Sequence, residues 1–267
     1  MDCVDRLLKE GQIVLKGLYS RAQINSIKES CSLAEHQFRL KGGTVNRNGI
    51  HIEHPFVYDP AFLSIIEDDR ICPMLEEAIG DRLALANCAL TNRQILGNKG
   101  DVLQVGSTWH TDSRYVQRGK VRLNHGFGYL AVLCIDNFSE SNGATRYVPG
   151  SHLFKDRPSR VLSDKDYEIR SVEAMSGDVF ILDTGLWHSA GDPASKPRWG
   201  MFNMYTPWYF KPYFNYTNMF TKDQVLGLSD RLLHLLHFTS EPPLSQMDRL
   251  QTLLTAEEVR ERKIFSN

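Results

Sequence analysis

The sequence predicts a sandwich or barrel of short β-strands, with helices before and after it. Three observations support this fold class. Residues 1–80 carry helical patterns, residues 83–210 alternate short β-branched and aromatic runs with turn clusters, and the last fifty residues return to helical patterns. Many short strands at this spacing are typical of a sandwich or barrel, whereas a parallel α/β sheet would alternate strands with helices. We therefore expect one domain of 267 residues, with a helical part to about 80, a β core over about 83–210 and a helical part over about 220–267.

Helix-start and helix-stop signals delimit the expected helices. Ser20, with a glutamine three residues later, has the spacing of a capping box and precedes apolar residues at helical spacing. Asp59, followed by a proline, predicts a second helix start, and a third helix is expected to end at Gly80. Two further capping boxes, beginning at Thr221 and Thr255, predict helices near the C-terminal end.

Two longer segments, residues 41–55 and 153–167, show little apolar periodicity. The first holds three glycines and two asparagines, and the second is rich in charged residues. Neither is expected to bury enough apolar surface to order itself strongly, and long loops in compact domains are commonly functional. We predict that both are mobile walls that close over a bound substrate.

The composition argues against several classes of partner. A net charge of −1 provides no long-range attraction to nucleic acid or to anionic membranes, and 42% hydrophobic residues are enough for a sizeable core. Five scattered cysteines without a C-x-x-C pair favour a reducing compartment. The N-terminus has no apolar signal-peptide core, and the longest apolar run, YLAVLCI, is too short to span a bilayer. We expect a cytoplasmic globular protein.

The short stretch WHTD brings a histidine and an aspartate together at His110 and Asp112. In a strand, residues i and i+2 point to the same side, so an imidazole nitrogen and a carboxylate oxygen can converge there. A lone H-x-D pair is a weak signal, because a surface histidine beside an acid gives the same pattern.

His188 follows the strand-like run VFILD and an apolar turn. Taken alone, it reads as a core histidine bonded to backbone. If it lies across the barrel from His110, two imidazoles and one carboxylate occupy one face of an octahedral metal and leave three positions open. That arrangement is typical of non-haem Fe(II) oxygenases.

Arg198 begins an alternating strand ten residues after His188 and shares a face with Gly200, Phe202 and Met204. If that face points inward, a buried guanidinium needs an anion, and its planar fork suits the far carboxylate of a dicarboxylate. A surface arginine in a Lys-Pro-Arg turn is the alternative.

In combination these motifs make the chain resemble the phytanoyl-CoA dioxygenase family of Fe(II)- and 2-oxoglutarate-dependent oxygenases. The matching stretches are WHTD at 109–112, NGATRYVPGSH at 142–152, GDVFILDTGLWHSAG at 177–191, and Arg198. The resemblance implies a mainly β fold with flanking helices around a double-stranded β-helix (jelly-roll) core. It implies Fe(II) bound by His110, Asp112 and His188, with Arg198 holding the distal carboxylate of 2-oxoglutarate.

Other residues are assigned with less support. Thr145 and Gln94 lie on strands expected to line the site and are candidates for further 2-oxoglutarate contacts. Some family members use a serine two residues after the distal histidine, where this chain has Ala190. His152, in the VPGSH turn, is expected to be structural, because it ends a strand and is not a ligand in the family. The same structural or solvated role is expected for His51, His54, His125, His234 and His237.

The resemblance implies oxidation of an unactivated C–H bond with O2 as co-substrate and release of succinate and CO2. Hydroxylation is the simplest outcome, and desaturation, epoxidation and cyclisation share its first step. Residues expected at the barrel mouth suggest a small-molecule substrate with apolar surface, such as a natural-product intermediate: Arg114, Tyr115, Trp187 and Tyr205, with Trp208 nearby.

Two other classes of function stay open from the sequence. A zinc-dependent hydrolase or isomerase on a cupin-like barrel would give Arg198 no role. A non-catalytic binding protein with a relict site would not need the intact set of His110, Asp112 and His188.

Overall fold

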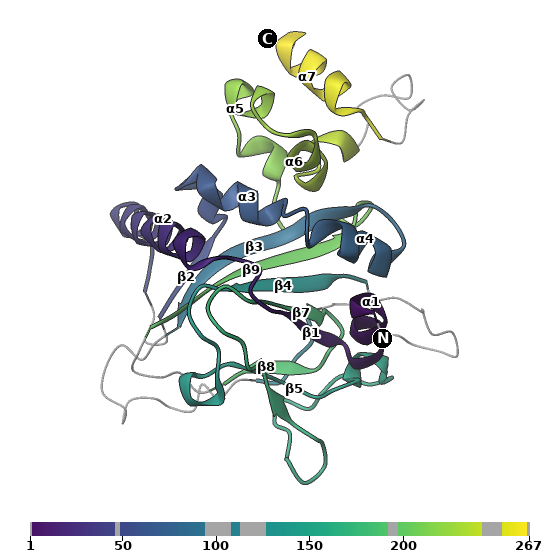
Figure 1. Cartoon of the computed structure of the whole chain (residues 1–267). Coiled ribbons are helices and arrows are strands. Elements are labelled where there is room, and N and C mark those ends of the chain that lie inside the picture. Colours follow the sequence, from purple (N-terminus) through teal and green to yellow (C-terminus); the bar gives the residue numbers. More distant parts are fainter. Residues whose placement is uncertain are drawn as a thin grey trace.

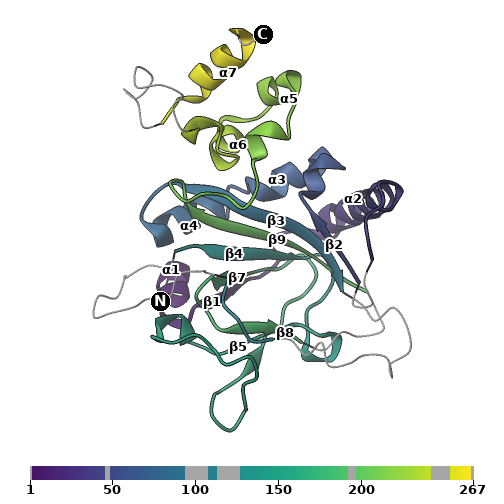
Figure 2. The same ribbon diagram turned by 180° about the vertical axis from the view of Figure 1, so that it is seen from behind.

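The computed structural model describes residues 2–45, 49–93, 108–112, 127–191, 197–241 and 253–265. A six-stranded antiparallel sheet with the order β1-β7-β4-β9-β3-β2 lies opposite a three-stranded sheet with the order β6-β5-β8 (Figure 1). Helices cover the outer face of the larger sheet, and the view from behind shows the same layers (Figure 2). This is the mainly β architecture with flanking helices that the sequence predicts.

The strands are short except for two long neighbours in the larger sheet, β3 and β9. Their bounds are β1 Gln12–Leu15, β2 Gly49–Glu53, β3 Leu83–Arg93, β4 Tyr129–Cys134, β5 Thr145–Tyr147, β6 Arg170–Ser171, β7 Val179–Asp183, β8 His188–Ala190 and β9 Arg198–Pro207.

The helices come before and after the sheets in the chain. They are α1 Cys3–Glu10, α2 Arg21–Leu40, α3 Leu63–Ile66, α4 Cys72–Ile79, α5 Lys222–Leu226, α6 Asp230–Leu235 and α7 Ala256–Phe265. Short 3-10 turns cover Pro55–Val57, Pro60–Phe62, Glu140–Asn142, Ser151–Leu153, Tyr216–Asn218 and Phe238–Ser240.

The central strands of the larger sheet are buried on both faces. All six residues of β4 and all five of β7 are buried. On β7, Ile181 packs toward the helices, while Phe180 and Leu182 pack between the two sheets. Because both faces are covered, these strands read as continuous apolar runs instead of alternating ones. Successive side chains of β9 also point to opposite faces of the sheet, so every second residue of β9 faces the space between the sheets.

Capping signals in the sequence locate the starts of three of the seven described α-helices. The capping boxes at Ser20 and Thr221 are both formed, and Thr255 exchanges the equivalent hydrogen bonds with Glu258 ahead of α7. Gly80 ends α4 in the left-handed conformation with φ 76°. The helix predicted after Asp59 is a 3-10 turn followed by the four-residue α3, although Asp59 does accept from the backbone of the new turn.

The N-terminal part is not purely helical, which corrects the sequence prediction. β1 pairs with β7, and β2 pairs with β3. β2 lies within residues 41–55, where we predicted a loop; its Ile50 and Ile52 are buried and alternate with half-exposed polar residues. A five-residue strand is stabilised by its distant partner, and the local pattern does not reveal that partner.

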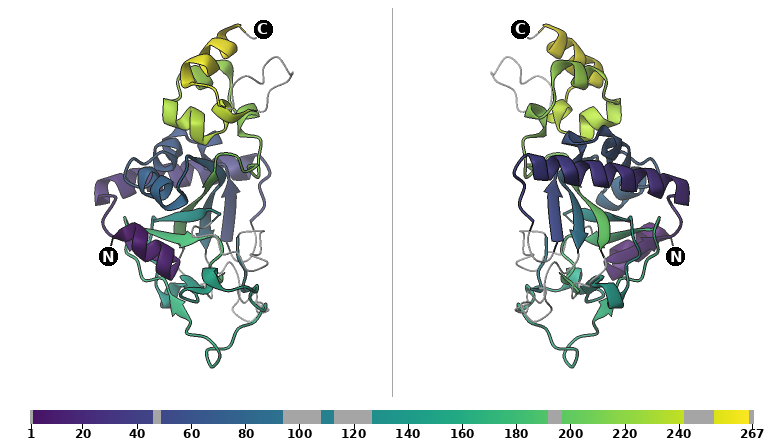
Figure 3. Two further views of the ribbon diagram at one scale, coloured as in Figure 1. Left: turned by 90° about the vertical axis from the view of Figure 1, so that its right-hand side faces the viewer. Right: turned by 90° about the vertical axis from the view of Figure 1, so that its left-hand side faces the viewer.

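The C-terminal helices lie beyond α3 and α4, on the side away from the smaller sheet (Figure 3). Arg231 of α6 pairs with Asp69 at 2.9 Å, which ties this layer to the N-terminal helices. Among the described helices, none combines the length and the apolar character that a membrane span requires.

Candidate metal centre and anion site

His110 and His188 face each other across an isolated antiparallel bridge at the edge of β8. Each backbone N–H donates to the other residue's carbonyl oxygen at 3.0 Å. Directly opposed residues point to the same face, and the two imidazole centroids lie 4.3 Å apart. Backbone pairing therefore brings together two histidines that are far apart in the sequence.

Asp112 completes the group from the same stretch as His110. Its Oδ1 lies 3.7 Å from His110 Nε2, and its Oδ2 lies 3.5 Å from His188 Nε2. One ligand atom from each of the three residues fits within a span of 4.8 Å. Two nitrogens and one oxygen on a single side are the donors of a facial-triad metal centre, with the remaining directions open.

The outer nitrogen of each imidazole is held by a backbone carbonyl. His110 Nδ1 lies 2.8 Å from the Thr108 oxygen, and His188 Nδ1 lies 2.9 Å from the Leu186 oxygen. A carbonyl can only accept, so each Nδ1 carries the proton and each Nε2 keeps a free lone pair for a metal. Desolvation, and then the nearby His188, lower the pKa of His110, which favours the neutral ligand form.

Arg198 begins β9 and points between the sheets, as the strand parity predicted. It is 4% exposed. Its Nη2 donates to the Gly143 carbonyl at 2.8 Å, and its Cζ lies 3.9 Å from the centroid of the Phe138 ring. Its Nε and Nη1 are buried and have no hydrogen-bond partner among the described residues.

The Arg198 guanidinium has the features of an anion site. Burial, and then the positive charge of Arg93, lower the pKa of Arg198 to about 10, so it stays charged at neutral pH. A buried charge with two unused N–H groups is costly unless a negative group is bound to it. A carboxylate that accepts in a bidentate manner matches this requirement.

Thr145 lies on the face that carries the metal-binding histidine. Across β5 and β8, Tyr147 pairs with His188 and Thr145 pairs with Ala190. Cross-strand partners point to the same side, and Thr145 is 8% exposed. Thr145 therefore shares the face of the smaller sheet that carries His188, and its contact with 2-oxoglutarate stays a prediction. Gln94 lies outside the described residues.

Two of the predicted substrate-pocket residues are located elsewhere. Tyr205 is fully buried on the outer face of the sheet, where its hydroxyl donates to the Ile66 carbonyl at 2.7 Å. Trp187 points away from the metal side, and its Nε1 donates to the Asp156 carbonyl at 3.2 Å. In both cases the neighbouring residue points inward: Met204 precedes Tyr205, and His188 follows Trp187. Because successive residues of a strand point to opposite faces, Tyr205 and Trp187 point outward. Arg114 and Tyr115 lie outside the described residues.

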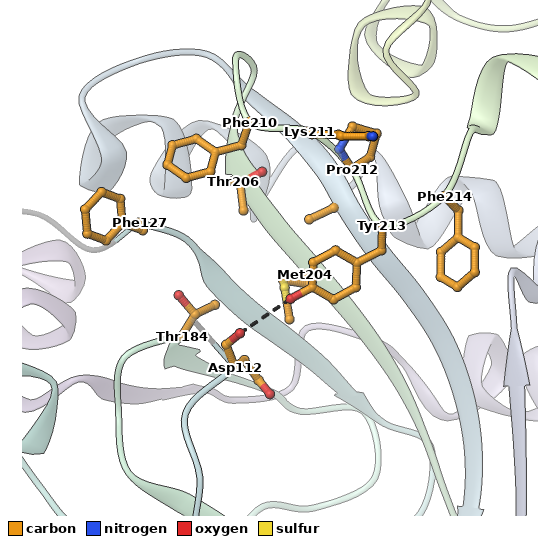
Figure 4. A pocket seen from close by; sticks show the side chains of 11 residues that line it. Asp112, Phe127, Thr184, Met204, Thr206, Phe210, Lys211, Pro212, Tyr213 and Phe214 are labelled. Carbon is orange, nitrogen blue, oxygen red and sulfur yellow. Dashed lines mark hydrogen bonds between the residues drawn. The ribbon is translucent and has the colours of Figure 1, made fainter. Parts of the chain in front are cut away.

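A cavity of about 540 Å³ opens beside Asp112 (Figure 4). Its described lining combines apolar and aromatic side chains with polar ones in nearly equal share: Ala86, Asp112, Phe127, Thr184, Met204, Thr206, Phe210, Lys211, Pro212, Tyr213 and Phe214. The Tyr213 hydroxyl donates to the backbone carbonyl of Asp112 at 3.4 Å, so this ring links the cavity wall to the metal-binding stretch. The sequence prediction missed the aromatic residues after β9, although the run WYFKPYFNY was the available signal.

Five of the other described histidines make local structural contacts, in agreement with the prediction that they are not metal ligands. His152 Nε2 bonds to the Leu8 carbonyl at 3.0 Å, and His237 Nε2 bonds to the Leu85 carbonyl at 3.3 Å. His54 packs against the Phe214 ring, and His234 contacts the Thr239 hydroxyl. His51 lies between Thr91 and Glu53 on the sheet surface. His125 lies outside the described residues.

Two facing sheets with a His-Asp-His group and, between them, a buried guanidinium that no described acidic side chain pairs with have the features of a mononuclear non-haem metal protein. The chain belongs to the phytanoyl-CoA dioxygenase family, whose family model matches residues 7–198. The resemblance seen in the sequence motifs is thereby confirmed.

Individual relatives are distant in sequence. The uncharacterized protein Rv1501 of Mycobacterium tuberculosis is 28% identical over 192 residues, which are 68% of this chain and 65% of that protein. The chain thus spans just under two thirds of the length of this relative. Dioxygenase cdmA of Talaromyces verruculosus is 24% identical over 237 residues, covering 78% of this chain and 73% of that one.

Solved structures with the same fold include two α-ketoglutarate or 2-oxoglutarate complexes. The epimerase SnoN in complex with Fe3+, α-ketoglutarate and nogalamycin RO has a TM-score of 0.61 at 16% identity, over 94% of this chain and 93% of that chain. HygX from Streptomyces hygroscopicus with nickel and 2-oxoglutarate has a TM-score of 0.61 at 16% identity, over 78% and 87%. The predicted double-stranded β-helix core is confirmed by these neighbours.

Proposed function

We propose that this chain is an Fe(II)- and 2-oxoglutarate-dependent dioxygenase that oxidises an unactivated C–H bond of an apolar small molecule, with O2 consumed and succinate and CO2 released. One observation carries the proposal. His110, Asp112 and His188 offer three ligand atoms within 4.8 Å, and Arg198 offers a buried guanidinium with two unused N–H groups. Family membership and the iron- and 2-oxoglutarate-bound neighbours support the same chemistry.

The triad residues hold the metal, and the backbone prepares them for it. The carbonyls of Thr108 and Leu186 keep the protons on the outer imidazole nitrogens, which leaves both Nε2 atoms ready to bind. When bound, iron together with 2-oxoglutarate supplies the activation of O2 that breaks a C–H bond. Three protein ligands leave room for that co-substrate and for O2.

Arg198 selects the co-substrate. Its Nε and Nη1 have no partner among the described residues, so the planar guanidinium has donors left for the distal carboxylate of 2-oxoglutarate, and the Phe138 ring packs against one face of it. Thr145, with its 8% exposed side chain on the inner face, is a second contact for the same carboxylate. A zinc-dependent hydrolase would leave this guanidinium without a function.

The cavity beside Asp112 favours an organic substrate with ring or chain apolar surface. Rings of Phe127, Phe210 and Tyr213 contribute to its wall, and Lys211 and two threonines supply the polar groups. A relative from Stutzerimonas stutzeri is named a probable α-ketoglutarate-dependent hypophosphite dioxygenase. A volume of about 540 Å³ is far more than so small an anion needs, so we favour a larger apolar molecule here.

Hydroxylation is the simplest outcome of this chemistry. Similar folds also belong to an epimerase and to a carbocyclase of nogalamycin biosynthesis, so a ring closure or an inversion after the same C–H cleavage is the second candidate. The mass of the product separates these outcomes, because hydroxylation adds one oxygen, cyclisation removes two hydrogens and epimerisation changes neither.

Anaerobic addition of Fe(II) and 2-oxoglutarate to the purified protein tests the proposal. We expect a visible metal-to-ligand charge-transfer band, and on admission of O2 the slow formation of succinate, measured by mass spectrometry. His188→Ala should lose both signals while keeping the circular dichroism of the wild type, because the ligands sit on a preformed sheet edge. Succinate formation at the wild-type rate in His188→Ala would contradict the assignment.

A further inference from the structure

Each metal-binding histidine directly follows a tryptophan, and the two tryptophans meet on the other side of the sheet. Trp109 precedes His110 and Trp187 precedes His188. Neighbouring residues in extended backbone point to opposite faces, so the indoles point away from the ligand side. Trp109 is 4% exposed and Trp187 is 5% exposed, and both belong to one apolar cluster with Val148.

Residues 153–169, here called the strap, cover this tryptophan cluster. The strap packs Leu162, Tyr167 and Ile169 against the cluster. The Tyr167 and Phe154 rings meet the Trp187 indole edge to face, with centroids 5.4 and 5.2 Å away. The charged residues of the strap remain exposed, so its few apolar side chains account for its attachment.

Backbone carbonyls of the strap also bond to both ligand-bearing stretches. The Arg160 carbonyl accepts from the Trp109 backbone N–H at 3.1 Å, one residue before His110. The Asp156 carbonyl accepts from Trp187 Nε1 at 3.2 Å, one residue before His188. Ser151, just ahead of the strap, accepts from the Trp187 backbone N–H at 2.8 Å. The strap therefore spans the same two stretches that the metal would join from the opposite face.

We propose that the strap holds His110 and His188 in the metal-binding arrangement through Trp109 and Trp187, so that the metal affinity of the site depends on the strap. This proposal rests on the metal centre of the proposed function. The physical basis is preorganisation: a site whose ligands are already ordered loses less conformational freedom when the metal binds. Trp109 and Trp187 are positioning residues, since they act through the histidines that follow them.

The role assigned to the strap differs from that of a lid over the substrate. The strap lies against the rear of the ligand stretches, whereas the described cavity beside Asp112 is lined by other segments. Coupling between two sites is reciprocal, so a metal whose binding depends on the strap must in turn stabilise the strap. This gives a second measurement that does not depend on turnover.

Titration of the apo protein with Co(II), followed by its visible absorption, measures the first consequence. We expect Trp187→Phe, which removes the Nε1 donor to Asp156, to weaken Co(II) binding roughly tenfold, the lower end of the usual cost of losing a supporting contact behind a ligand. Leu162→Ala is the milder variant should the tryptophan change impair folding. Trp199→Phe is the matched control, because Trp199 packs against the helix-side core. The Co(II) affinity of this variant should equal that of the wild type.

Trypsin cleavage after Lys155, Arg160 and Lys165 measures the second consequence. Co(II) should slow cleavage of the strap in the wild type and leave it unchanged in His188→Ala. If Trp187→Phe and Leu162→Ala bind Co(II) as tightly as the wild type, or lose only thermal stability, the strap proposal is wrong. If the wild type binds no Co(II), or His188→Ala binds it equally well, the metal centre itself is wrong.

Discussion

At the scale of single residues, the anion site depends on one guanidinium. Arg198 donates one hydrogen bond to Gly143, and two further buried nitrogens, Nε and Nη1, have no partner in the part of the chain that the structure describes. A lysine would keep the charge and lose the planar fork. We expect Arg198→Lys to raise the KM for 2-oxoglutarate about tenfold; this is about 1.4 kcal/mol, less than the roughly 2–5 kcal/mol cost of removing one partner of a buried charge pair, because lysine keeps the charge.

Steady-state succinate formation at varied 2-oxoglutarate measures this effect. Arg93→Lys is a useful comparison, since Arg93 already donates to the Gly191 carbonyl at 2.9 Å and is half-buried on the neighbouring strand. An unchanged KM in Arg198→Lys would show that another residue holds the co-substrate.

Position 200 has no room for a side chain larger than that of glycine, because the Phe138 ring occupies the adjacent space. A Cβ at Gly200 would lie 2.9 Å from the Phe138 Cζ. That ring also lies against the Arg198 guanidinium. We expect Gly200→Ala to lower the free energy of unfolding by about 1–3 kcal/mol, the usual cost of overpacking, and to raise the KM for 2-oxoglutarate.

Urea unfolding, with Gly227→Ala as control, tests the crowding at Gly200. The nearest atom to a Cβ at Gly227 is the Gln224 carbonyl oxygen at 3.6 Å, an ordinary contact, and its φ is −88°. Gly227→Ala should be neutral or slightly stabilising. Equal stability of the two variants would mean that the Phe138 ring moves aside at no cost.

At the scale of elements, capping contributes to the helical layer without reaching the site. The capping box of α2 joins Ser20 and Gln23, and the α2 helix covers the outer face of the larger sheet. We expect Ser20→Ala to lower the free energy of unfolding by about 1 kcal/mol and to leave the KM for 2-oxoglutarate unchanged. Thermal unfolding checks this, and Ser32→Ala, at an exposed position of the same helix, is the control. A larger loss in the control than at Ser20 would contradict the capping argument.

At the scale of the whole molecule, the larger sheet separates a stabilising face from a chemical one. Tyr205 lies on the helix side, where its hydroxyl bonds to the Ile66 carbonyl, whereas Tyr213 lines the cavity. We expect Tyr205→Phe to cost about 1–3 kcal/mol in unfolding free energy, because it leaves the buried Ile66 carbonyl with only the weak Cys72 thiol donor at 3.5 Å. Tyr213→Phe should change it by less than about 0.5 kcal/mol, since this residue is exposed.

Chemical unfolding of both variants, alongside 2-oxoglutarate turnover, tests this separation. Tyr205→Phe should retain wild-type turnover at a temperature where it stays folded. If a folded Tyr205→Phe protein has altered turnover, Tyr205 affects the reaction, and the separation of the larger sheet into a stabilising face and a chemical face is wrong.

The sequence by itself determined the fold class, some helix starts and the chemistry-bearing residues. Capping boxes are local, because Ser20 and Gln23 contact each other within one turn, and so they are readable from spacing. His110, Asp112 and Arg198 were identifiable because their motifs in combination resemble the phytanoyl-CoA dioxygenase family, although each motif alone has a common structural explanation. Strand parity placed Arg198 inward.

Only the tertiary structure decided which surfaces these residues share. Antiparallel pairing of residues distant in sequence placed His110 opposite His188, made Gly49–Glu53 a strand, and turned Tyr205 and Trp187 away from the cavity. The charged strap becomes attached through Leu162 and Tyr167 because two distant tryptophans supply its apolar surface. Such contacts depend on partners that no local pattern specifies, since a strand's period fixes two faces and leaves the choice between them to packing.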